Sequence, residues 1–497
     1  MRVVLAISND LGRKMIRVPL AMSLLLSAGA GIAFITYRYG WIAGLAVATA
    51  PVALAGSWGA LPIAFEKVKQ AFTGLKGVRF VFLLLVIACS FEAFFPEINY
   101  RSLEAVKQSP VNTVNLVRVL LIGAAGAWTI LVSLRQNLPL SLDRKGPLKW
   151  FLFYSLFALV SASYARLPIV SAGKALEVVS ETAFFCLIVA LLPFEEMIWA
   201  WNIIWGSTAL LLTAMWVSAL ASPSTGFEYP PGALLPVVTG SLPVLAPNGV
   251  GQHAAGLAIV SLIRLIDGSS VSRRRETRLW GGLLALGLVS LVSSQARTSI
   301  ASFCVASCLI LYWRRKLRLL ASFALAAVGL AGVGLIPLVT SFLRRGQDAT
   351  ALLSLTGRIN YWQVAWDMFL ESKWFGYGFY TAHRIDLSER FRFLDLSTVD
   401  NTYLEVLLGV GLIGTFPLVV ALVRLGVNLF RSGFAVRTYP LLARVRYEMA
   451  GFFIIVVIRS VTGPSFQVHG HSMVLLLLVM AFTQRLVRGG TCDGRIL

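Results

Sequence analysis

Charged residues are scarce in this sequence. Only 13% of its 497 residues are Asp, Glu, Lys or Arg, while 57% are hydrophobic; soluble domains carry about 25% charged residues. This composition excludes a soluble globule and predicts a polytopic membrane protein. Acidic residues are rarer still, since 23 Asp and Glu stand against 44 Lys and Arg. In a membrane protein such an excess of positive charge indicates basic loops on one side of the bilayer, and nucleic acid is not expected as a partner.

Metal-binding and nucleotide-binding patterns are missing as well. The five cysteines lie mostly inside apolar runs, without metal-ligand spacing, so neither a disulfide framework nor a zinc site is expected. The sequence has no G-x-x-x-x-G-K-[ST] run and no Asp-x-Asp pair for a metal-bound sugar nucleotide. These absences argue against a nucleotide donor on the cytoplasmic side, and we predict no cofactor and no metal.

Long apolar runs dominate the chain. A bilayer core of about 30 Å requires about 20 apolar residues per helix. The runs lie near residues 18–36, 41–63, 80–96, 113–134, 150–165, 171–192, 198–220, 251–266, 279–296, 299–313, 319–343, 401–423, 448–463 and 471–487. Because some runs are short or merge, we expect an all-α polytopic membrane protein with about 12–14 transmembrane helices.

The basic loops give the orientation. With the N-terminus in the cytoplasm, every strongly basic loop falls on the cytoplasmic side, together with the C-terminus. These loops are residues 67–79, 135–149, 272–278, 314–318, 431–446 and 485–495. Three longer segments then face the other side, namely 97–112, 221–250 and 344–400. The second is rich in proline and is expected to be irregular.

Segment 344–400 predicts an amphipathic helix. After Gly357, apolar side chains recur at helical spacing as Ile359, Trp362, Trp366 and Phe369, and polar residues fill the rest of the helical wheel. Such a helix either lies in the membrane interface, where Trp is favoured, or packs against the other loops. Both alternatives remain open at this point.

Ionisable residues cluster in the half of the protein that faces away from the cytoplasm. Each costs about 2.5–3.5 kcal/mol near the centre of a span, so each calls for a reason. The set comprises Arg118, Arg166, Lys174, Glu177, Glu181, His253, Arg297, Arg459, His469 and His471. It predicts a polar, cationic cavity that opens outward. Within it, the helical spacing of Lys174, Glu177 and Glu181 favours a structural ion pair.

Two arginines suggest the chemistry. Arg297 lies in the short turn SSQARTS, and Arg358 lies in TGR just before the predicted amphipathic helix. Either could serve structure alone, for example by reaching lipid phosphate. Together they suit a diphosphate, whose oxygens accept bidentate hydrogen bonds and whose charge needs stabilisation as it leaves.

Four motifs in a fixed order carry a family resemblance. SSQARTS is followed by LTGR-x-x-x-W (residues 355–362), WFGYGF (374–379) and DNTYLEVLLGVGLIG (400–414). The set resembles the O-antigen ligase and polymerase superfamily, over roughly residues 240–430. The resemblance implies a GT-C-like fold in which an oligosaccharide passes from a polyprenyl diphosphate to an acceptor sugar, by an inverting displacement without metal.

One position departs from the ligase pattern. Asn401, Gly411 and Gly414 fit the spacing of the ligases, but Asp400 stands where they carry His. Either Asp400 is the base that accepts the acceptor proton, or His253, His383 or His469 replaces it. The departure favours a polymerase over a ligase. The predicted catalytic residues are Asp400, Arg297, Arg358 and His253, and the predicted substrate-binding residues are Arg118, Arg166, Asn401, Arg459 and His469.

The leading hypothesis is a polysaccharide polymerase of the bacterial inner membrane, with cytoplasmic termini and a periplasmic active site. A ligase that transfers glycan to lipid A core or protein is one alternative, and a transporter or flippase is another. Expected partners are undecaprenyl-diphosphate-linked oligosaccharide, an acceptor glycan, membrane lipids and a chain-length regulator. Residues 251–430, including loop 344–400, are the expected core, between helical segments 1–250 and 431–497.

Overall fold

The structure is a computed structural model that describes residues 75–94, 113–135, 146–230, 235–267, 274–332, 336–344, 358–390, 399–435, 439–466 and 469–489. The contacts below lie within the compact unit Val81–Leu497. The expected spans 18–36 and 41–63 and the segment 97–112 lie outside the described residues.

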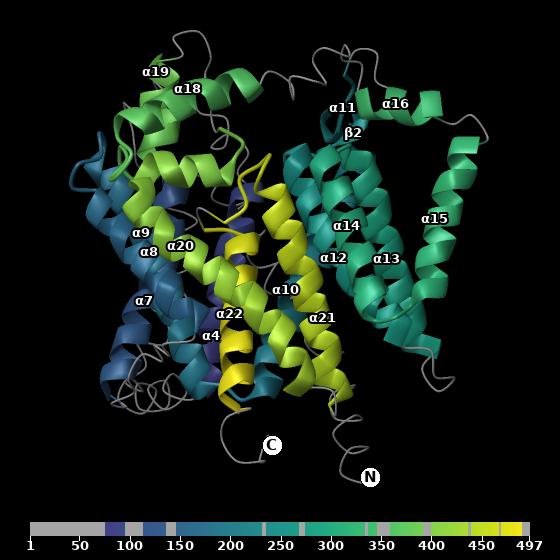
Figure 1. Ribbon diagram of the computed structural model, residues 1–497, viewed down its shortest axis with the longest axis horizontal. Helices are drawn as coiled ribbons and strands as arrows, with labels where there is room; N and C mark the ends of the chain where they lie inside the picture. The colour runs from purple at the N-terminus through teal and green to yellow at the C-terminus, as the bar shows by residue number, and fades with distance from the viewer. Residues whose placement is uncertain are drawn as a thin grey trace, which may run out of the picture. The chain divides into compact units, whose positions relative to one another are not determined.

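Helices make up nearly all of the described chain, as Figure 1 shows. The α-helices are α4 (Leu75–Phe91), α7 (Thr113–Arg135), α8 (Pro147–Ser161), α9 (Pro168–Leu191), α10 (Phe194–Ala221), α11 (Pro223–Gly226), α12 (Pro247–Asp267), α13 (Arg274–Ser294), α14 (Arg297–Trp313), α15 (Leu317–Gly332), α16 (Ile336–Arg344), α18 (Arg358–Glu371), α19 (Leu387–Arg390), α20 (Thr402–Ala435), α21 (Pro440–Arg459) and α22 (His471–Gly489). A 3₁₀ turn, η1 (Glu92–Phe94), and a π-helical turn, η3 (Ala382–Asp386), complete them. The predicted all-α polytopic membrane fold is confirmed.

Five helices among the described residues are long and apolar enough to cross a membrane: Val117–Leu134, Phe194–Ala221, Pro247–Asp267, Glu276–Ser294 and Thr402–Ser432. The predicted run 319–343 differs from the structure, which has two helices there, α15 and α16. Pro337 is the second residue of α16. A proline is tolerated in the first turn of a helix but breaks a helix interior, so one continuous span is disfavoured.

The predicted irregular segment 221–250 contains some regular structure. Strands β1 (Phe227–Glu228) and β2 (Val237–Val238) form an antiparallel ribbon, with Phe227 opposite Val238. The ribbon follows the short helix α11, and the carbonyl of Gly226 accepts the N–H groups of Thr239 and Gly240 at 3.0 Å. Local backbone pairing therefore occurs even in this proline-rich stretch.

Helix α22 lies in the interior. Every side chain from Met473 to Phe482 is buried, as expected for a helix that is hydrophobic on all sides. It contacts α8, α9, α10, α20 and α21. Around it, α9 packs on α7 and α8, α8 packs on α20, and α21 packs on α12 and α14 (Figure 1). Helix α22 therefore packs against both α20 and α21, which carry residues of the candidate site described below.

A buried ion pair links three of these helices. Arg264 of α12 donates through Nε and Nη2 to the Glu448 carboxylate of α21, both at 2.7 Å. The same carboxylate accepts the indole N–H of Trp201 at 2.8 Å, and Arg264 also donates to Asn202 at 2.7 Å, both on α10. Sequence reasoning did not single out this network. We call the Arg264–Glu448 pair, with its partners Trp201 and Asn202, the closed ion pair.

Helix α20 is broken at Gly411, whose φ is 60° and ψ is −167°. The break leaves backbone groups on both sides without partners inside the helix. Residues 373–378, here called the splice segment, supply hydrogen-bond partners for these groups. The N–H groups of Tyr377 and Gly378 donate to the carbonyls of Leu408 and Gly409 at 2.8 and 2.9 Å. The N–H groups of Leu412 and Ile413 donate to the backbone carbonyls of Lys373 and Trp374 at 2.8 and 3.2 Å. Four backbone hydrogen bonds from the splice segment therefore bridge the break.

Two glycines make this close approach feasible. A Cβ on Gly411 would lie 2.3 Å from the carbonyl oxygen of Trp374, and a Cβ on Gly376 would lie 2.4 Å from that of Leu408. Both residues also have positive φ, +60° and +70°, which favours glycine. Two of the four sequence motifs, WFGYGF and VLLGVGLIG, are thus the two interlocking halves of one joint.

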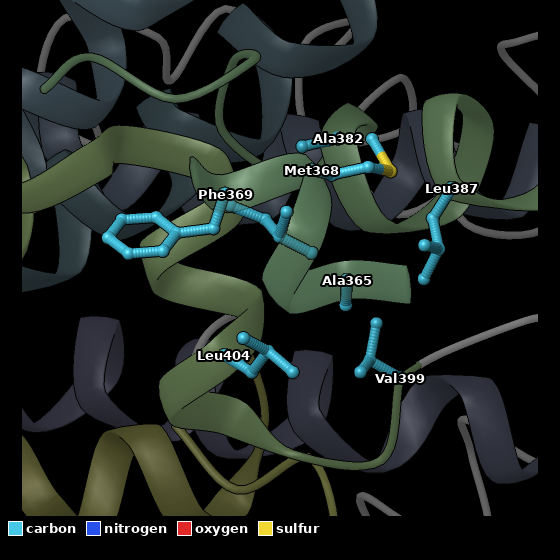
Figure 2. Close-up of a cluster of buried hydrophobic side chains, with 8 residues drawn as sticks. Ala365, Met368, Phe369, Ala382, Leu387, Val399 and Leu404 are labelled. Carbon is cyan, nitrogen blue, oxygen red and sulfur yellow. The ribbon is translucent and has the colours of Figure 1, made fainter. Parts of the chain in front are cut away.

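The predicted helix after Gly357 is present as α18, and it packs on the first part of α20. Figure 2 shows its buried face, where Ala365, Met368 and Phe369 meet Leu404 and Val399. Ile359 and Trp366 remain exposed instead, at 37% and 47%. The helix therefore uses only part of its apolar face for packing, and the rest faces a cleft.

Candidate functional site

Four segments distant in sequence meet at one junction. Arg358, the first residue of α18, pairs with Asp400 just before α20, with Nη2 and Oδ2 2.8 Å apart. Its Nη1 donates to the carbonyl of Thr462 after α21 at 3.1 Å. The Thr462 hydroxyl donates to that of Thr298, in the first turn of α14, at 2.6 Å. Residues 297–298, 358, 400–402 and 459–462 together form what we call the junction.

Local sequence fixes the start of α20. Asn401 caps the helix, because its Oδ1 accepts the N–H of Leu404 at 3.1 Å. The buried Glu405 reaches back and accepts the N–H of Val399 at 3.0 Å, a reciprocal arrangement close to a capping box. Asp400, between Val399 and Asn401, has a positive φ of 54°, which Asp and Asn tolerate better than most residues. This turn presents the Asp400 carboxylate to Arg358.

Arg459 supports the junction from the end of α21. Its side chain is buried, and it donates to the carbonyls of Asn248 at 2.8 Å and Pro464 at 3.0 Å. It lies within electrostatic range of Asp400 and Arg358. The guanidinium groups of Arg358 and Arg459 therefore lie near the single carboxylate of Asp400, which leaves excess positive charge at the junction.

Three helices begin at the junction: α14 at Arg297, α18 at Arg358 and α20 at Thr402. A helix N-terminus carries partial positive charge and free N–H groups, which favours anions. Arg297 itself donates to the carbonyl of Arg344, at the end of α16, at 3.2 Å. The sum of helix ends and guanidinium groups suits a phosphate or diphosphate.

Predicted residues His253 and His469 lie in a histidine cluster with His471, in which His469 and His471 are buried and His253 is partly buried. The Nδ1 of His469 contacts the Glu181 carboxylate, and the rings of His253 and His471 stand perpendicular with centroids 4.8 Å apart. The charge of Arg459 reaches His253, so the cluster lies beside the junction. No distance places a histidine of this cluster against Asp400, and their catalytic role stays a prediction.

Arg118 and Arg166 pair elsewhere. Arg118 lies 3.4 Å from Glu177, which also accepts from Lys174 at 3.2 Å. The predicted ion pair between Lys174 and Glu177 is therefore present, whereas Glu181 turns to His469. Arg166 lies 3.6 Å from Asp386 in η3, and half of its side chain is exposed. The described contacts of both arginines are with acids outside the junction.

His383, another candidate base, lies in η3. It is buried, with its ring against that of Tyr380, and the two centroids lie 5.8 Å apart. Burial, and after it the positive charge of Arg384, lowers the pKa of His383 well below its usual value. A neutral imidazole is expected here at neutral pH.

A cleft of about 690 Å³ borders the junction. Helix α18 lines it with Ile359, Trp362, Gln363, Trp366 and Asp367, and α20 with Tyr403, Leu404 and Leu407, next to Asn401. Sequence reasoning missed this cleft. It also missed Thr298 and Thr462, because their junction contacts depend on tertiary structure.

Within the described residues, no group of three or more His, Cys, Asp or Glu side chains is placed to hold a metal ion. His469 and His471 are among these described residues, and neither belongs to such a group. The prediction of a metal-independent reaction rests on the sequence and remains a prediction.

Comparison with known families agrees with the motif order. Residues 282–419 match the family model described as O-antigen ligase. The match includes α14, α18, Asp400 and the Gly411 break, and it ends before Arg459 and Thr462. No curated protein matches the chain. The predicted resemblance to the O-antigen ligase and polymerase superfamily is confirmed.

Proposed function

We propose that this integral membrane protein of the O-antigen ligase and polymerase superfamily is a polysaccharide polymerase. It transfers oligosaccharide from undecaprenyl diphosphate to the end of an acceptor glycan, at the outer face of the bacterial inner membrane. The observation that carries the proposal is the Arg358–Asp400 pair, at a junction where three helix N-termini meet. It combines an anion site with a carboxylate beside it.

The donor diphosphate is assigned to Arg358, Arg297 and Arg459. Arginine forks bind phosphate oxygens through two parallel hydrogen bonds, and the helix N-termini add their partial charges. Charge accumulates on the diphosphate as the sugar leaves, so preorganised donors stabilise the transition state more than the ground state. The three arginines and the helix ends supply that charge from the protein alone.

Asp400 is assigned as the base. The acceptor hydroxyl oxygen bonds to the anomeric carbon from the face opposite the diphosphate, and its proton passes to the Asp400 carboxylate. The bond from the anomeric carbon to the phosphate oxygen breaks, and its electron pair leaves with undecaprenyl diphosphate. This displacement inverts the anomeric centre.

The ion pair suggests how Asp400 becomes available. Arg358 holds the carboxylate at 2.8 Å. A bound diphosphate competes for the same guanidinium and weakens that pair, so the carboxylate becomes a better acceptor of a proton. Binding of the donor thereby prepares the base.

Substitution of the pair tests the proposal. In purified protein supplied with a lipid-linked repeat unit, Arg358→Ala and Asp400→Asn are each expected to slow transfer about 10²–10³-fold, as for lost transition-state donors. Arg390→Ala is the matched control, because Arg390 also pairs with a carboxylate, Glu371, but on an exposed surface outside the junction. Wild-type polymer lengths from both junction variants would refute the assignment.

A ligase remains the second candidate, favoured by the description of the matched family. The two activities differ in what accumulates when the protein is lost. Loss of a polymerase leaves single repeat units on the carrier, whereas loss of a ligase leaves undischarged long chains. Asp400 in place of the ligase histidine supports the polymerase.

The proposed setting follows from the basic loops. Cytoplasmic termini place the junction on the periplasmic side, where the lipid-linked donor is presented. The acceptor glycan and the membrane lipids are then direct partners, and a chain-length regulator is a further proposed one. Reporter fusions at the C-terminus and within residues 221–250 would test this orientation.

A further inference from the structure

The cleft between α18 and α20 has no role in the chemistry described so far. We infer that it binds a sugar unit of the acceptor glycan and delivers its hydroxyl to Asp400. This inference rests on the proposed transfer reaction and adds to it the place where the acceptor lies.

The position of the cleft supports an acceptor site. Its lining begins at Ile359 and Asn401, each one residue after a member of the Arg358–Asp400 pair. Its volume of about 690 Å³ falls within the range of ligand pockets, about 300–1,000 Å³. The cleft therefore borders the backbone positions that follow both members of the pair, and the inference is that a molecule bound there reaches the Asp400 carboxylate.

The lining has the chemistry that carbohydrates require. Trp362 and Trp366 offer aromatic faces on which the C–H face of a sugar ring can stack. Gln363, Asp367 and Asn401 add amide and carboxylate groups that donate to and accept from hydroxyl groups. Helical spacing places all four α18 residues on one side of that helix.

The aromatic groups are held in place before any ligand arrives. The indole N–H of Trp362 donates to the carbonyl of Val399 at 3.0 Å, and Trp362 also packs on the cluster in Figure 2. The Trp366 ring lies against Phe369, with centroids 5.1 Å apart. Such preorganisation lowers the entropic cost of binding.

A lipid chain fits the same lining poorly. It would cover Gln363, Asp367 and Asn401 without offering hydrogen-bond partners, and burial of polar groups without partners is unfavourable. A glycan satisfies these groups and also uses the aromatic rings. The lining is mainly apolar, and we assign it to a sugar unit because a lipid chain would offer its three polar side chains no partners.

Steady-state transfer measurements test the inference. The donor is a lipid-linked repeat unit, and the acceptors are size-fractionated oligosaccharides from partial acid hydrolysis of the polysaccharide of the producing cell. Trp366→Ala is expected to raise the acceptor concentration for half-maximal rate about tenfold, equivalent to about 1.4 kcal/mol, and to leave the donor dependence unchanged. Trp366→Phe, which keeps an aromatic face, should restore most of the affinity.

Trp374→Ala is the matched control. Trp374 is a tryptophan of the same region, 63% exposed, and it does not line the cleft. Its contribution to the splice segment is a backbone carbonyl, which the substitution retains. We expect this variant to keep the wild-type acceptor dependence.

The outcomes separate the two proposals. If the wild-type protein transfers sugar but Trp366→Ala and Gln363→Ala both keep the wild-type acceptor dependence, the cleft is not the acceptor site and the transferase proposal stands. If Trp366→Ala lowers only the binding of phosphatidylglycerol vesicles, a lipid occupies the cleft and the inference is wrong. If the wild-type protein transfers no sugar from the lipid-linked donor, the transferase proposal itself fails.

Discussion

Two arginine–carboxylate pairs, Arg264–Glu448 and Arg358–Asp400, differ in their surroundings. In the closed ion pair, the Arg264 and Glu448 side chains are 5% and 0% exposed, and Trp201 and Asn202 complete their hydrogen bonds. In the junction, the Arg358 and Asp400 side chains are 22% and 29% exposed, beside the cleft. Glu448 lies roughly 16 Å along α21 from Arg459 of the junction.

This contrast separates support from chemistry. A buried pair whose hydrogen bonds are complete gives a ligand no access, and it holds α10, α12 and α21 in register. A partly exposed pair beside a cleft can exchange one partner for a substrate. Ionic residues in a membrane protein are thus better sorted by what surrounds them than by their distance from the membrane centre.

The largest expected effect is on the closed ion pair. Glu448→Ala leaves the Arg264 charge buried without its carboxylate, and the expected loss of stability is about 3–5 kcal/mol. The loss of stability is measured by thermal unfolding of the detergent-solubilised protein, with size-exclusion chromatography to monitor the folded fraction. Glu371→Ala is the control, since Glu371 pairs with Arg390 on the surface. Equal melting of the two variants would show that the closed pair does not support the fold.

An intermediate effect is expected at the break in α20. Gly411→Ala places a Cβ 2.3 Å from the Trp374 carbonyl at a positive φ, and strain of this kind costs about 1–3 kcal/mol. We also expect loss of transfer, because the break sets the direction in which the Asp400 end of α20 projects. Gly426→Ala, where the nearest contact is an ordinary 3.5 Å to Phe453, is the control in the same helix. Retained activity and stability in Gly411→Ala would contradict this role.

The smallest expected effect is on the stability of the junction pair. Asp400→Asn keeps the shape of the side chain, and partly exposed ion pairs contribute about 0–1 kcal/mol. Its melting temperature should stay near that of the wild type even though transfer is lost. A fall as large as that of Glu448→Ala would remove the distinction between the two pairs.

Sequence patterns predicted much of the fold for physical reasons. Long apolar runs exist because the bilayer demands them, so the helices α7 to α10 and α12 to α14 lie close to the predicted spans. Helical spacing after Gly357 predicted α18. Five of the predicted site residues lie at the junction, where their proposed roles await experiment: Arg297, Arg358, Asp400, Asn401 and Arg459.

Other features depend on contacts that no local pattern encodes. The carbonyl of Thr462 that accepts from Arg358 is a backbone group, and every residue has one. The closed ion pair joins Arg264 to Glu448 across 184 positions. The amphipathic pattern of α18 showed an apolar face, but not that α20 would cover only part of it. The features that the sequence did not predict are contacts between helices rather than the helices themselves.

The joint between the splice segment and α20 has a consequence for biosynthesis. Residues 373–378 precede α20 in the chain, so they are made first and are available as α20 follows. A straight helix of 34 residues would be about 51 Å long, well beyond the bilayer core of about 30 Å. The splice segment would then act as a template for the bend at Gly411. It would thereby set how many residues of α20 enter the membrane, and hence the depth of Asp400.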